Sequence, residues 1–559
     1  MIPVPDQPFG QPSGQALDQP PPFYYLDNFQ QVLAWIAERY DDLLIDDERA
    51  LLALFPTLPR ASRALLVRMV MRKGTVFRSS KLCYDEIGDI RAAALPLVAA
   101  GLLEDDPLLD IEQLFALLHK PDIVKAFGLD ASLRHLRKAE QLEALRVMYA
   151  QPRRYSQWCA DGEPVWRNLT QALCDRLRLI FFGNFHQDWT EFVLSDLGIY
   201  QYEKVAFAPT ARGFQTRRDI DDFLALYACR TRFENGEDPA AIVADLPACA
   251  ADNEWLRSRR SKLIFHMAQH LEKLRDWPAA QALYAGCDYP GARARAIRVL
   301  EKHGQLRDAF DLLQQAQAAP ESEAERQQLL RMAPRLARAL GHARPAPTTA
   351  APVLRMDLSL PPPAQPEYVE YVVREHLMQT DAPVYYVENS LINSLFGLLC
   401  WEAIFCPLPG AFFHPYQRAP ADLHSADFQR RRAQQFAACF AQLDNGQYRA
   451  TIRAHYAAKA GIESPFVHWG ALDDTLLELA LDCMPALHLR RAFERILQDI
   501  KTNRCGFPDL IQFWPAERRY TMIEVKGPGD RLQDNQLRWI DYCAAHQMPV
   551  AVCYLQWAA

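Results

Sequence analysis

The sequence has no long hydrophobic run and no recognisable export signal. None of its apolar stretches reaches about 18 residues, the length that a membrane-spanning helix needs. The first twenty residues are rich in proline, glutamine and aspartate, and they have neither a positive start nor an apolar core. We therefore expect a cytoplasmic protein without a membrane partner, associated with the nucleoid if the protein is bacterial.

Zinc motifs and nucleotide-binding motifs are also absent from the sequence. The thirteen cysteines include no CxxC pair and no Cys/His array, which predicts reduced thiols and no structural zinc site. No GxxxxGKS/T loop occurs, so we expect no nucleotide cofactor. The net charge of −7 excludes a chain that is basic throughout, so any contact with nucleic acid must rest on local basic patches.

The residues with the clearest chemistry lie near the C-terminus. Two β-rich runs, Asp509–Trp514 and Arg519–Val525, flank a proline-containing turn and predict a hairpin. Because successive strand side chains alternate between faces, Glu524 and Lys526 point to the same side. Asp509 opens the first strand, so two carboxylates and one lysine are expected at one edge of a small sheet.

This cluster suits a hard divalent cation. Mg²⁺ and Mn²⁺ prefer one or two carboxylates together with water and phosphate oxygens. We expect Asp509, Glu524 and the carbonyl of Val525 to hold one ion, while Lys526 orients or helps to deprotonate the attacking water. The alternative is a surface Glu/Lys pair on an edge strand, but the Pro-Asp fifteen residues before Glu-Val-Lys favours the metal site.

The strings GFPDL and IEVKGPGDRLQDNQLRW resemble the VRR-NUC branch of the PD-(D/E)xK nuclease superfamily, as found in the Fanconi-associated nucleases. The resemblance implies a structure-selective DNA nuclease that cuts 5′ flaps, trims DNA from a 5′ end and unhooks interstrand crosslinks. It also implies that Glu388 is a metal ligand that could hold or bridge a second ion, and that Gln536 lies near the metal. The Val-Glu-Asn around Glu388 departs from the family's common Gly-Glu-Gly, and helix capping is the alternative role for Glu388.

Two groups of basic residues are candidates for DNA binding. The region from residue 60 to residue 81 contains no acid, and the string RMVMRKGTVFRSSKLCYDEI is similar to the start of the family's N-terminal DNA-binding region, while Leu108–Leu129 resembles its SAP-type helix pair. A third group, Arg257, Arg259 and Arg260, is expected to hold a 5′ phosphate or flap, with a plain helix surface as the alternative. The candidates in the first two groups are Arg60, Arg63, Arg68, Arg72, Lys73, Arg78, Lys81, Arg134, Arg137, Arg153 and Arg154.

The resulting fold class is a multidomain, mainly α protein with a helical SAP-like region, TPR-like repeats and a C-terminal α/β PD-(D/E)xK nuclease core. A weak 29-residue repeat over residues 251–340 supports the repeats. Asp530 is expected to cap a helix over 531–546, followed by a closing strand, which gives a ββαβ core. The predicted domains are 1–59 (lead and helical segment), 60–155 (SAP-like), 156–343 (TPR-like), 344–366 (proline-rich linker) and 367–559 (VRR-NUC), with an insertion at 411–482 of no assigned role.

The sequence leaves two other functions open. One is a Holliday-junction or restriction-like nuclease with the same core, which the helical N-terminal domains disfavour. The other is a non-catalytic DNA-binding repeat scaffold, which the intact Glu388, Asp509, Glu524 and Lys526 disfavour. The expected partner is branched DNA with a 5′ flap or 5′ end, the expected cofactor is Mg²⁺ or Mn²⁺ with two ions, and no ubiquitin partner is expected.

Overall fold

The computed structural model describes residues 21–189, 191–192, 195, 198–207, 212–249, 253–342, 353–425 and 427–558. These residues form two compact units, one up to residue 201 with 212–214, and a second made of 202–211 and the chain from residue 215 onward. The first unit runs beyond the boundary predicted at residue 155, and most of the predicted lead lies outside the described residues. No helix in the described part of the chain is long and apolar enough to cross a membrane.

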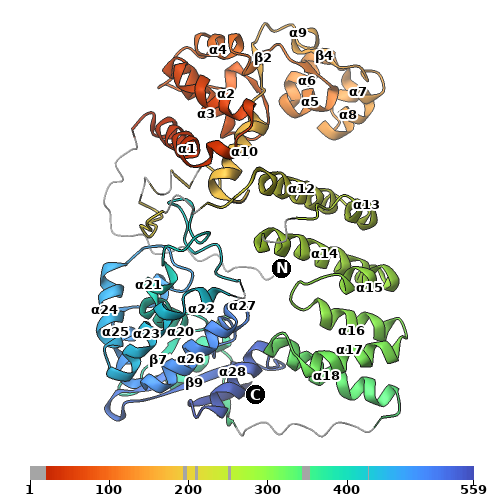
Figure 1. The fold of residues 1–559 in the computed structure, drawn as a ribbon. Helices are drawn as coiled ribbons and strands as arrows, with labels where there is room; N and C mark the ends of the chain where they lie inside the picture. The colour runs from red at the N-terminus through yellow and green to blue at the C-terminus, as the bar shows by residue number, and fades with distance from the viewer. Residues whose placement is uncertain are drawn as a thin grey trace. The chain divides into compact units, whose positions relative to one another are not determined.

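The first unit combines two helical clusters with small sheets. Its first part packs helices around a three-stranded sheet of order β1-β5-β2, and its second part surrounds the two-stranded sheet β3-β4. Figure 1 shows the helices of both parts. The elements are α1 (Tyr24–Tyr40), α2 (Asp46–Leu54), α3 (Arg60–Val70), β1 (Val76–Arg78), α4 (Ile90–Ala99), β2 (Leu103–Asp105), β3 (Leu108–Leu109), α5 (Ile111–Leu117), α6 (Lys120–Phe127), α7 (Ala131–Arg134), α8 (Lys138–Arg146), β4 (Arg153–Arg154), α9 (Tyr155–Trp158), β5 (Val165–Asn168) and α10 (Gln171–Phe182).

The second unit begins with a stack of helices in sequence order (Figure 1). Helices α15 and α17 begin 29 residues apart, and Ala280 and Ala309 are fully buried at matching positions in them. These small side chains allow the close helix packing that the repeat predicts. The helices are α12 (Arg217–Glu234), α13 (Pro239–Ala244), α14 (Glu254–Leu274), α15 (Trp277–Ala285), α16 (Ala292–Lys302), α17 (Leu306–Ala318) and α18 (Glu323–Ala339).

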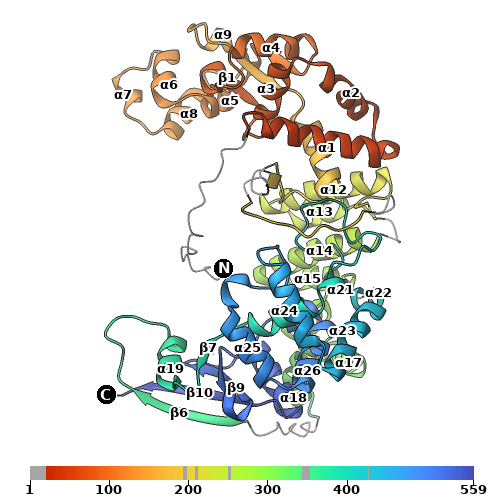
Figure 2. The same cartoon turned by 90° about the vertical axis from the view of Figure 1, so that its left-hand side faces the viewer.

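The C-terminal part of the second unit is built on a five-stranded sheet of order β6-β10-β9-β8-β7. β8 and β9 form the predicted antiparallel hairpin, and β10 returns parallel to β9 after α28, which completes the ββαβ core. β7 adds antiparallel to β8, and β6 adds parallel to β10 as the outer strand seen in Figure 2. The strands are β6 (Leu354–Leu360), β7 (Val384–Tyr386), β8 (Leu510–Trp514), β9 (Arg519–Lys526) and β10 (Val550–Trp557).

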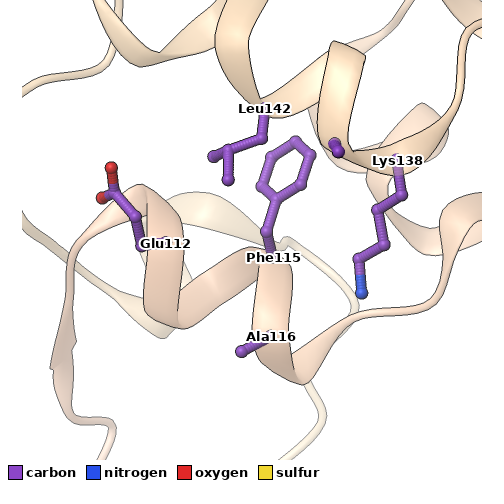
Figure 3. Close-up of a pocket in the computed structure, with 6 residues that line it drawn as sticks. Glu112, Phe115, Ala116, Lys138 and Leu142 are labelled. Carbon is purple, nitrogen blue, oxygen red and sulfur yellow. The ribbon is translucent and has the colours of Figure 1, made fainter. Parts of the chain in front are cut away.

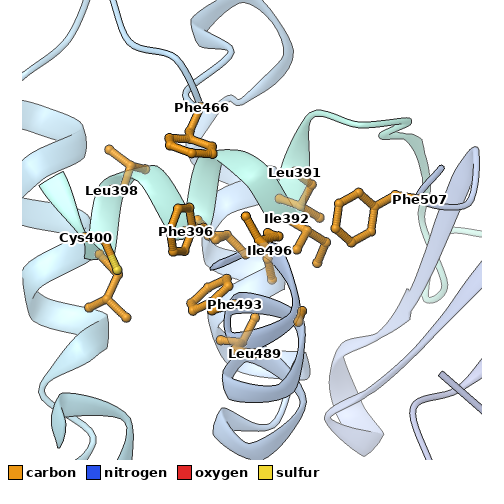
Figure 4. Packing of buried hydrophobic residues seen from close by; sticks show 14 of the residues in the cluster. Leu391, Ile392, Phe396, Leu398, Cys400, Phe466, Leu489, Phe493, Ile496 and Phe507 are labelled. Carbon is orange, nitrogen blue, oxygen red and sulfur yellow. The ribbon is translucent and has the colours of Figure 1, made fainter. Parts of the chain in front are cut away.

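Helices cover this sheet, and one of them, α20, is buried along its whole length. All nine residues of α20 are buried, and Phe396 packs against Phe466 and Phe493 (Figure 4). Gly397 permits this contact, because a Cβ there would lie 2.8 Å from the Cβ of Phe466. The helices are α19 (Val369–Leu377), α20 (Leu391–Leu399), α21 (Trp401–Ile404), α22 (Phe428–Arg431), α23 (Ala433–Asn445), α24 (Tyr448–Ala458), α25 (Asp474–Cys483), α26 (Ala486–Gln498), α27 (Ile500–Asn503) and α28 (Asp534–Ala545).

The helical stack and the sheet domain are joined through α18 and α28. Arg495 is 2% exposed and donates to Glu323 of α18 at 2.6 Å. Arg331 of α18 donates to Asp534 at the start of α28, again at 2.6 Å. The position of α28 therefore depends on α18 as well as on the sheet.

Two local predictions in this domain need correction. The segment 344–366, predicted as a linker, contributes strand β6 to the sheet, because Met356, Leu358 and Leu360 pack against its core; residues 344–352 lie outside the described part. Asp530 does not cap a helix: it accepts the N–H of Gly527 in a turn, and α28 begins at Asp534 with Gln533 as its N-cap.

Candidate active site

The β8–β9 hairpin brings Asp509, Glu524 and Lys526 together. Asp509 directly precedes β8, and its Oδ2 accepts the N–H of Val525 on the adjacent strand at 2.8 Å. The backbone carbonyl of Asp509 accepts the N–H of Val387 at 2.8 Å, which ties the same residue to the end of β7. Asp509 is thus fixed between two strands, with its carboxylate directed to the end of β9.

Glu524 and Lys526 are buried on one face of β9. Glu524 is 0% exposed and Lys526 is 7% exposed. The Nζ of Lys526 lies 2.7 Å from Oε1 of Glu524, so the two side chains form an ion pair. Neither oxygen of Glu524 accepts a hydrogen bond of good geometry from a described group, which leaves a buried carboxylate with unused acceptor capacity.

The two carboxylates carry strongly shifted pKa values. Burial raises the pKa of Asp509 to about 6, against the lowering effects of the Val525 N–H and of Lys526. Burial and then the charge of Asp509 raise the pKa of Glu524 to about 8. One lysine does not offset two buried carboxylates, so the site favours additional positive charge.

Glu388 lies beside this pair but is exposed. Its negative charge contributes to the raised pKa values of both Asp509 and Glu524, which places it near them. Its Oε2 accepts the hydroxyl hydrogen of Tyr386 at 2.6 Å, and its Oε1 accepts the side-chain amide of Asn389 at 3.0 Å. With the side chains in these positions, no three His, Cys, Asp or Glu residues in the described ranges form a group that could hold a metal ion.

Asn389 explains how the loop tolerates the Val-Glu-Asn sequence. Its φ is +51°, in the left-handed region that asparagine adopts more readily than most residues. Its Oδ1 accepts the N–H groups of Gly506 and Phe507 at 2.8 and 3.3 Å. Gly506 has φ +95°, and a Cβ there would lie 2.7 Å from the backbone of Asn535. The start of α20, the loop before β8 and the start of α28 are therefore packed together.

Comparison with known proteins shows the family of this chain. Family models match in three places: "FAN1, HTH domain" over residues 23–104, "Fanconi anemia-associated nuclease SAP domain" over 108–158 and "VRR-NUC domain" over 443–557. The "Fanconi-associated nuclease 1 homolog" of Pseudomonas aeruginosa is 56% identical over 539 residues, which cover 96% of each chain. The chain belongs to the Fanconi-associated nuclease family.

Further relatives are similar over most of the chain. The Arabidopsis thaliana homologue is 24% identical over 605 residues, covering 95% of this chain and 66% of its own. The structure titled "Crystal structure of paFAN1 bound to 2nt 5'flap DNA with gap" superposes with a TM-score of 0.93 at 56% identity, covering 97% of this chain and 99% of that one. A second crystal structure, with a 1-nucleotide 5′ flap, superposes with a TM-score of 0.90 over 96% of this chain and all of that one. Membership of the VRR-NUC nucleases implies dependence on a divalent metal.

Gln536 and Val525 contact other groups of the chain in this candidate site. The Oε1 of Gln536 accepts the N–H of Gln533 at 2.8 Å as part of a capping box of α28. Val525 donates its N–H to Asp509. A metal-binding carbonyl at Val525 and a catalytic amide at Gln536 stay predictions.

The basic residues of the first unit are spread over several elements. Arg60, Arg63 and Arg68 lie on α3, Arg72 and Lys73 follow it, Arg78 ends β1, and Lys81 ends a short 3₁₀ turn. Arg68 pairs with Glu86 at 2.7 Å, and Arg78 pairs with both Asp122 and Glu163 at 2.6 Å. These two arginines form ion pairs within the first unit. Contacts of this basic group with DNA stay predictions.

The second basic group lies within the SAP domain. Arg134 ends α7, Arg137 precedes α8, and Arg153 and Arg154 form β4. The Nζ of Lys138 donates to the carbonyl of Leu118 at 2.8 Å. Figure 3 shows a shallow hollow beside this lysine, lined by Glu112, Phe115, Ala116, Lys138, Ala139 and Leu142.

The third basic group lies on α14. Arg257 is exposed, and Arg260 donates to the carbonyl of Pro247 at 3.0 Å. The guanidinium of Arg259 lies over the rings of Trp255 and Phe223, at 4.4 and 4.8 Å. Burial lowers the pKa of Arg259 to about 10. Their role in holding a 5′ end stays a prediction.

Tyr386 and Asn389, which set the position of Glu388, were not predicted from the sequence. A signal for Tyr386 was present, because it lies two residues before Glu388 at the end of a strand and so points to the same side. The role of Asn389 depends on a backbone turn and on a contact with residues more than a hundred positions later, which local patterns do not encode.

Proposed function

We propose that this protein is a structure-selective DNA nuclease that acts as a 5′ flap endonuclease and 5′-to-3′ exonuclease in the repair of interstrand crosslinks. It hydrolyses the phosphodiester to leave a 5′ phosphate and a 3′ hydroxyl. The observation that carries the proposal is the buried cluster of Asp509, Glu524 and Lys526 at the end of β9. The two similar crystal structures are of a protein bound to 5′ flap DNA, which supports branched DNA as the substrate.

The chemistry of the donor set suits a divalent cation, although the described side chains do not form a group of three ligands in their present positions. The Asp509 and Glu524 carboxylates and the Val525 carbonyl would hold one Mg²⁺ or Mn²⁺, and Glu388 would hold or bridge a second ion. Both oxygens of Glu524 are buried, and apart from the ion pair with Lys526 they have no hydrogen-bond partner among the described residues, which suits metal ligation. When bound, the ions lower the pKa of the attacking water and offset the charge that develops on the phosphate.

The chain's own residues orient these groups. The Val525 N–H holds Asp509 in one rotamer, and Tyr386 and Asn389 hold the two oxygens of Glu388. Lys526 is buried beside Glu524, with an ammonium group that is available to orient the attacking water or a phosphate oxygen. Because these contacts exist before substrate binds, little reorganisation is needed at the reacting phosphate.

Labelled flap, fork and four-way junction substrates, each with and without Mn²⁺, test the proposal. Metal-dependent cutting of the flap in preference to the junction supports it. Preferential cutting of the four-way junction would indicate a Holliday-junction nuclease, and binding without cutting would indicate a DNA-holding scaffold.

Asp509→Ala should abolish cutting while DNA binding is largely retained. The matched control is Asp357→Ala, which removes an exposed carboxylate on β6 that pairs with Arg355. Retained cleavage in Asp509→Ala, measured under single-turnover conditions, would contradict the assignment of this site.

A further inference from the structure

Three tyrosines form a row that leads from solvent to Glu388. The ring of Tyr371 lies 5.6 Å from the ring of Tyr386, and the ring of Tyr368 lies 6.3 Å from that of Tyr371. The hydroxyl of Tyr386 at the inner end donates to Glu388 at 2.6 Å. We call Tyr368, Tyr371 and Tyr386 the tyrosine row.

The row is fixed to the end of the catalytic strand. Tyr371 lies on α19, which packs against β7 and β9, as Figure 2 shows for β7. The side chain of Val369 on α19 approaches Gly527 so closely that a Cβ there would lie 3.2 Å from it. Gly527 directly follows Lys526, so the row and the proposed reacting phosphate share one neighbourhood.

Two rings of the tyrosine row are exposed to solvent and not packed into the core. Tyr368 is 66% exposed and Tyr386 is 37% exposed, and both are among the large apolar side chains that the described surface leaves open. The guanidinium of Arg374 lies 4.8 Å from the ring of Tyr371, and its buried Nε has no hydrogen-bond partner in the part of the chain that the structure describes. Exposed ring faces beside an arginine are the elements with which proteins bind unpaired nucleotides.

We propose that the tyrosine row is a stacking site for the base of an unpaired nucleotide next to the scissile phosphodiester. The inference rests on the proposed nuclease function and names a substrate subsite within it. The outer rings of Tyr368 and Tyr371 supply the stacking faces, while Tyr386 links the row to Glu388. Glu370 on the same helix repels a phosphate, so the row contacts the base and not the backbone.

A base in this site must leave the duplex, because rings stack only on an open base face. Stacking on tyrosine is tolerant of base identity, so the subsite favours unpaired structure and not a sequence. It therefore contributes to selection of flaps and frayed ends over continuous duplex.

The test combines ring removal with a fluorescent base. Tyr368→Leu/Tyr371→Leu removes both outer rings, Tyr368→Phe/Tyr371→Phe keeps the rings and removes the hydroxyls, and Tyr227→Leu removes an exposed tyrosine on α12 as a control. Each is made in the Asp509→Ala background for binding and in the natural background for cleavage. Flap oligonucleotides carry 2-aminopurine, or an abasic site, at successive positions on both sides of the cut.

At one or two positions, binding should quench the fluorescence of 2-aminopurine. The double variant Tyr368→Leu/Tyr371→Leu (the Leu pair) should abolish that quenching, and Tyr368→Phe/Tyr371→Phe (the Phe pair) should preserve it. An abasic site at the same positions should weaken binding by roughly fivefold or more to the natural chain and leave binding to the Leu pair unchanged. Circular dichroism and thermal unfolding of each variant show whether the fold is retained.

Quenching at the same positions in the natural chain and the Leu pair would overturn the stacking site, as would the absence of any quenched position. Failure of the proposed function is seen separately, since the natural chain would then not cut flap DNA with Mn²⁺. If Tyr227→Leu lost as much 2-aminopurine quenching as the Leu pair, this would also count against a role specific to the tyrosine row.

Discussion

The hydroxyl of Tyr386 donates a 2.6 Å hydrogen bond to Glu388, and burial, strengthened by that carboxylate, raises the pKa of Tyr386 far above its usual value. The two residues stand at the end of β7, opposite Asp509. A phenol that keeps its proton at every physiological pH is a permanent donor to a proposed metal ligand, and it fixes the direction of that ligand.

Tyr386→Phe removes this donor and keeps the ring. We expect cleavage to slow by roughly tenfold, with a higher Mn²⁺ concentration needed for half-maximal rate, because Glu388 is then free to rotate. Titration of Mn²⁺ under single-turnover conditions measures this. Tyr385→Phe, on the opposite face of the same strand, is the control, and an equal metal requirement in both variants would argue against Tyr386 as a positioning residue.

Glu524→Gln tests the electrostatic strain of the metal-free site. The pKa of Glu524 is raised to about 8 in the folded protein, so the folded state holds a proton that the unfolded state releases near pH 4. The associated stability is fully present below that lower pH and is lost as the pH rises through about 8. In EDTA, the unfolding temperature of the natural chain should therefore fall relative to Glu524→Gln between pH 5 and pH 8.5.

Adding Mg²⁺ at pH 8.5 should raise the unfolding temperature of the natural chain more than that of Glu524→Gln, because the ion replaces the lost proton. If the unfolding temperatures of the two proteins change with pH in the same way, the buried charge of Glu524 does not destabilise the folded state. Glu524→Gln should also lose cleavage.

Asn389→Ala and Asn389→Gly separate backbone strain from hydrogen bonding. Alanine at φ +51° costs about 1 kcal/mol of backbone strain and also loses the contacts to Gly506 and Phe507. Glycine loses the same contacts without the strain. Chemical unfolding should rank the stability of the nuclease domain as Asn above Gly above Ala, and an equal loss in both variants would exclude backbone strain as a factor.

Glu323→Ala tests whether the helical stack supports the catalytic domain. It leaves the buried Arg495 without its carboxylate, although the rings of Trp539 and Tyr542 still cover the guanidinium. We expect a loss of about 2 kcal/mol in unfolding free energy. Arg326→Ala, which removes an exposed arginine on the same helix, should have little effect, and equal stability of the two variants would mean that this ion pair does not join the domains.

Much of the catalytic hairpin was predictable from the sequence, because alternation along β9 alone places Glu524 and Lys526 on one face. Other features depended on the rest of the fold. The proline-rich composition around β6 obscured the alternation of Met356, Leu358 and Leu360, which becomes informative only once β10 is available as a partner. Asp530 was misassigned because Asp is both a good N-cap and a good turn residue, and the Gly-Pro-Gly before it selects the turn.

The N-terminal region shows a similar division. The basic stretch over residues 60–81, with its interleaved apolar positions, indicated the helix α3. Charge composition does not reveal that Arg68 and Arg78 pair with acidic residues 18 and 85 positions later in the chain. The helix-turn-helix domain matched over residues 23–104 was not predicted either, since its strands β1 and β2 have three residues each and give weak periodic signals.

The strand order β6-β10-β9-β8-β7 has a consequence for biosynthesis. The ribosome makes β6 first of the five strands and β10 last, yet the two are neighbours, so β6 waits without its partner while nearly 200 residues are added between them. The sheet that carries Asp509, Glu524 and Lys526 is therefore completed only after β10 has been made, later than every helix of the stack that precedes it.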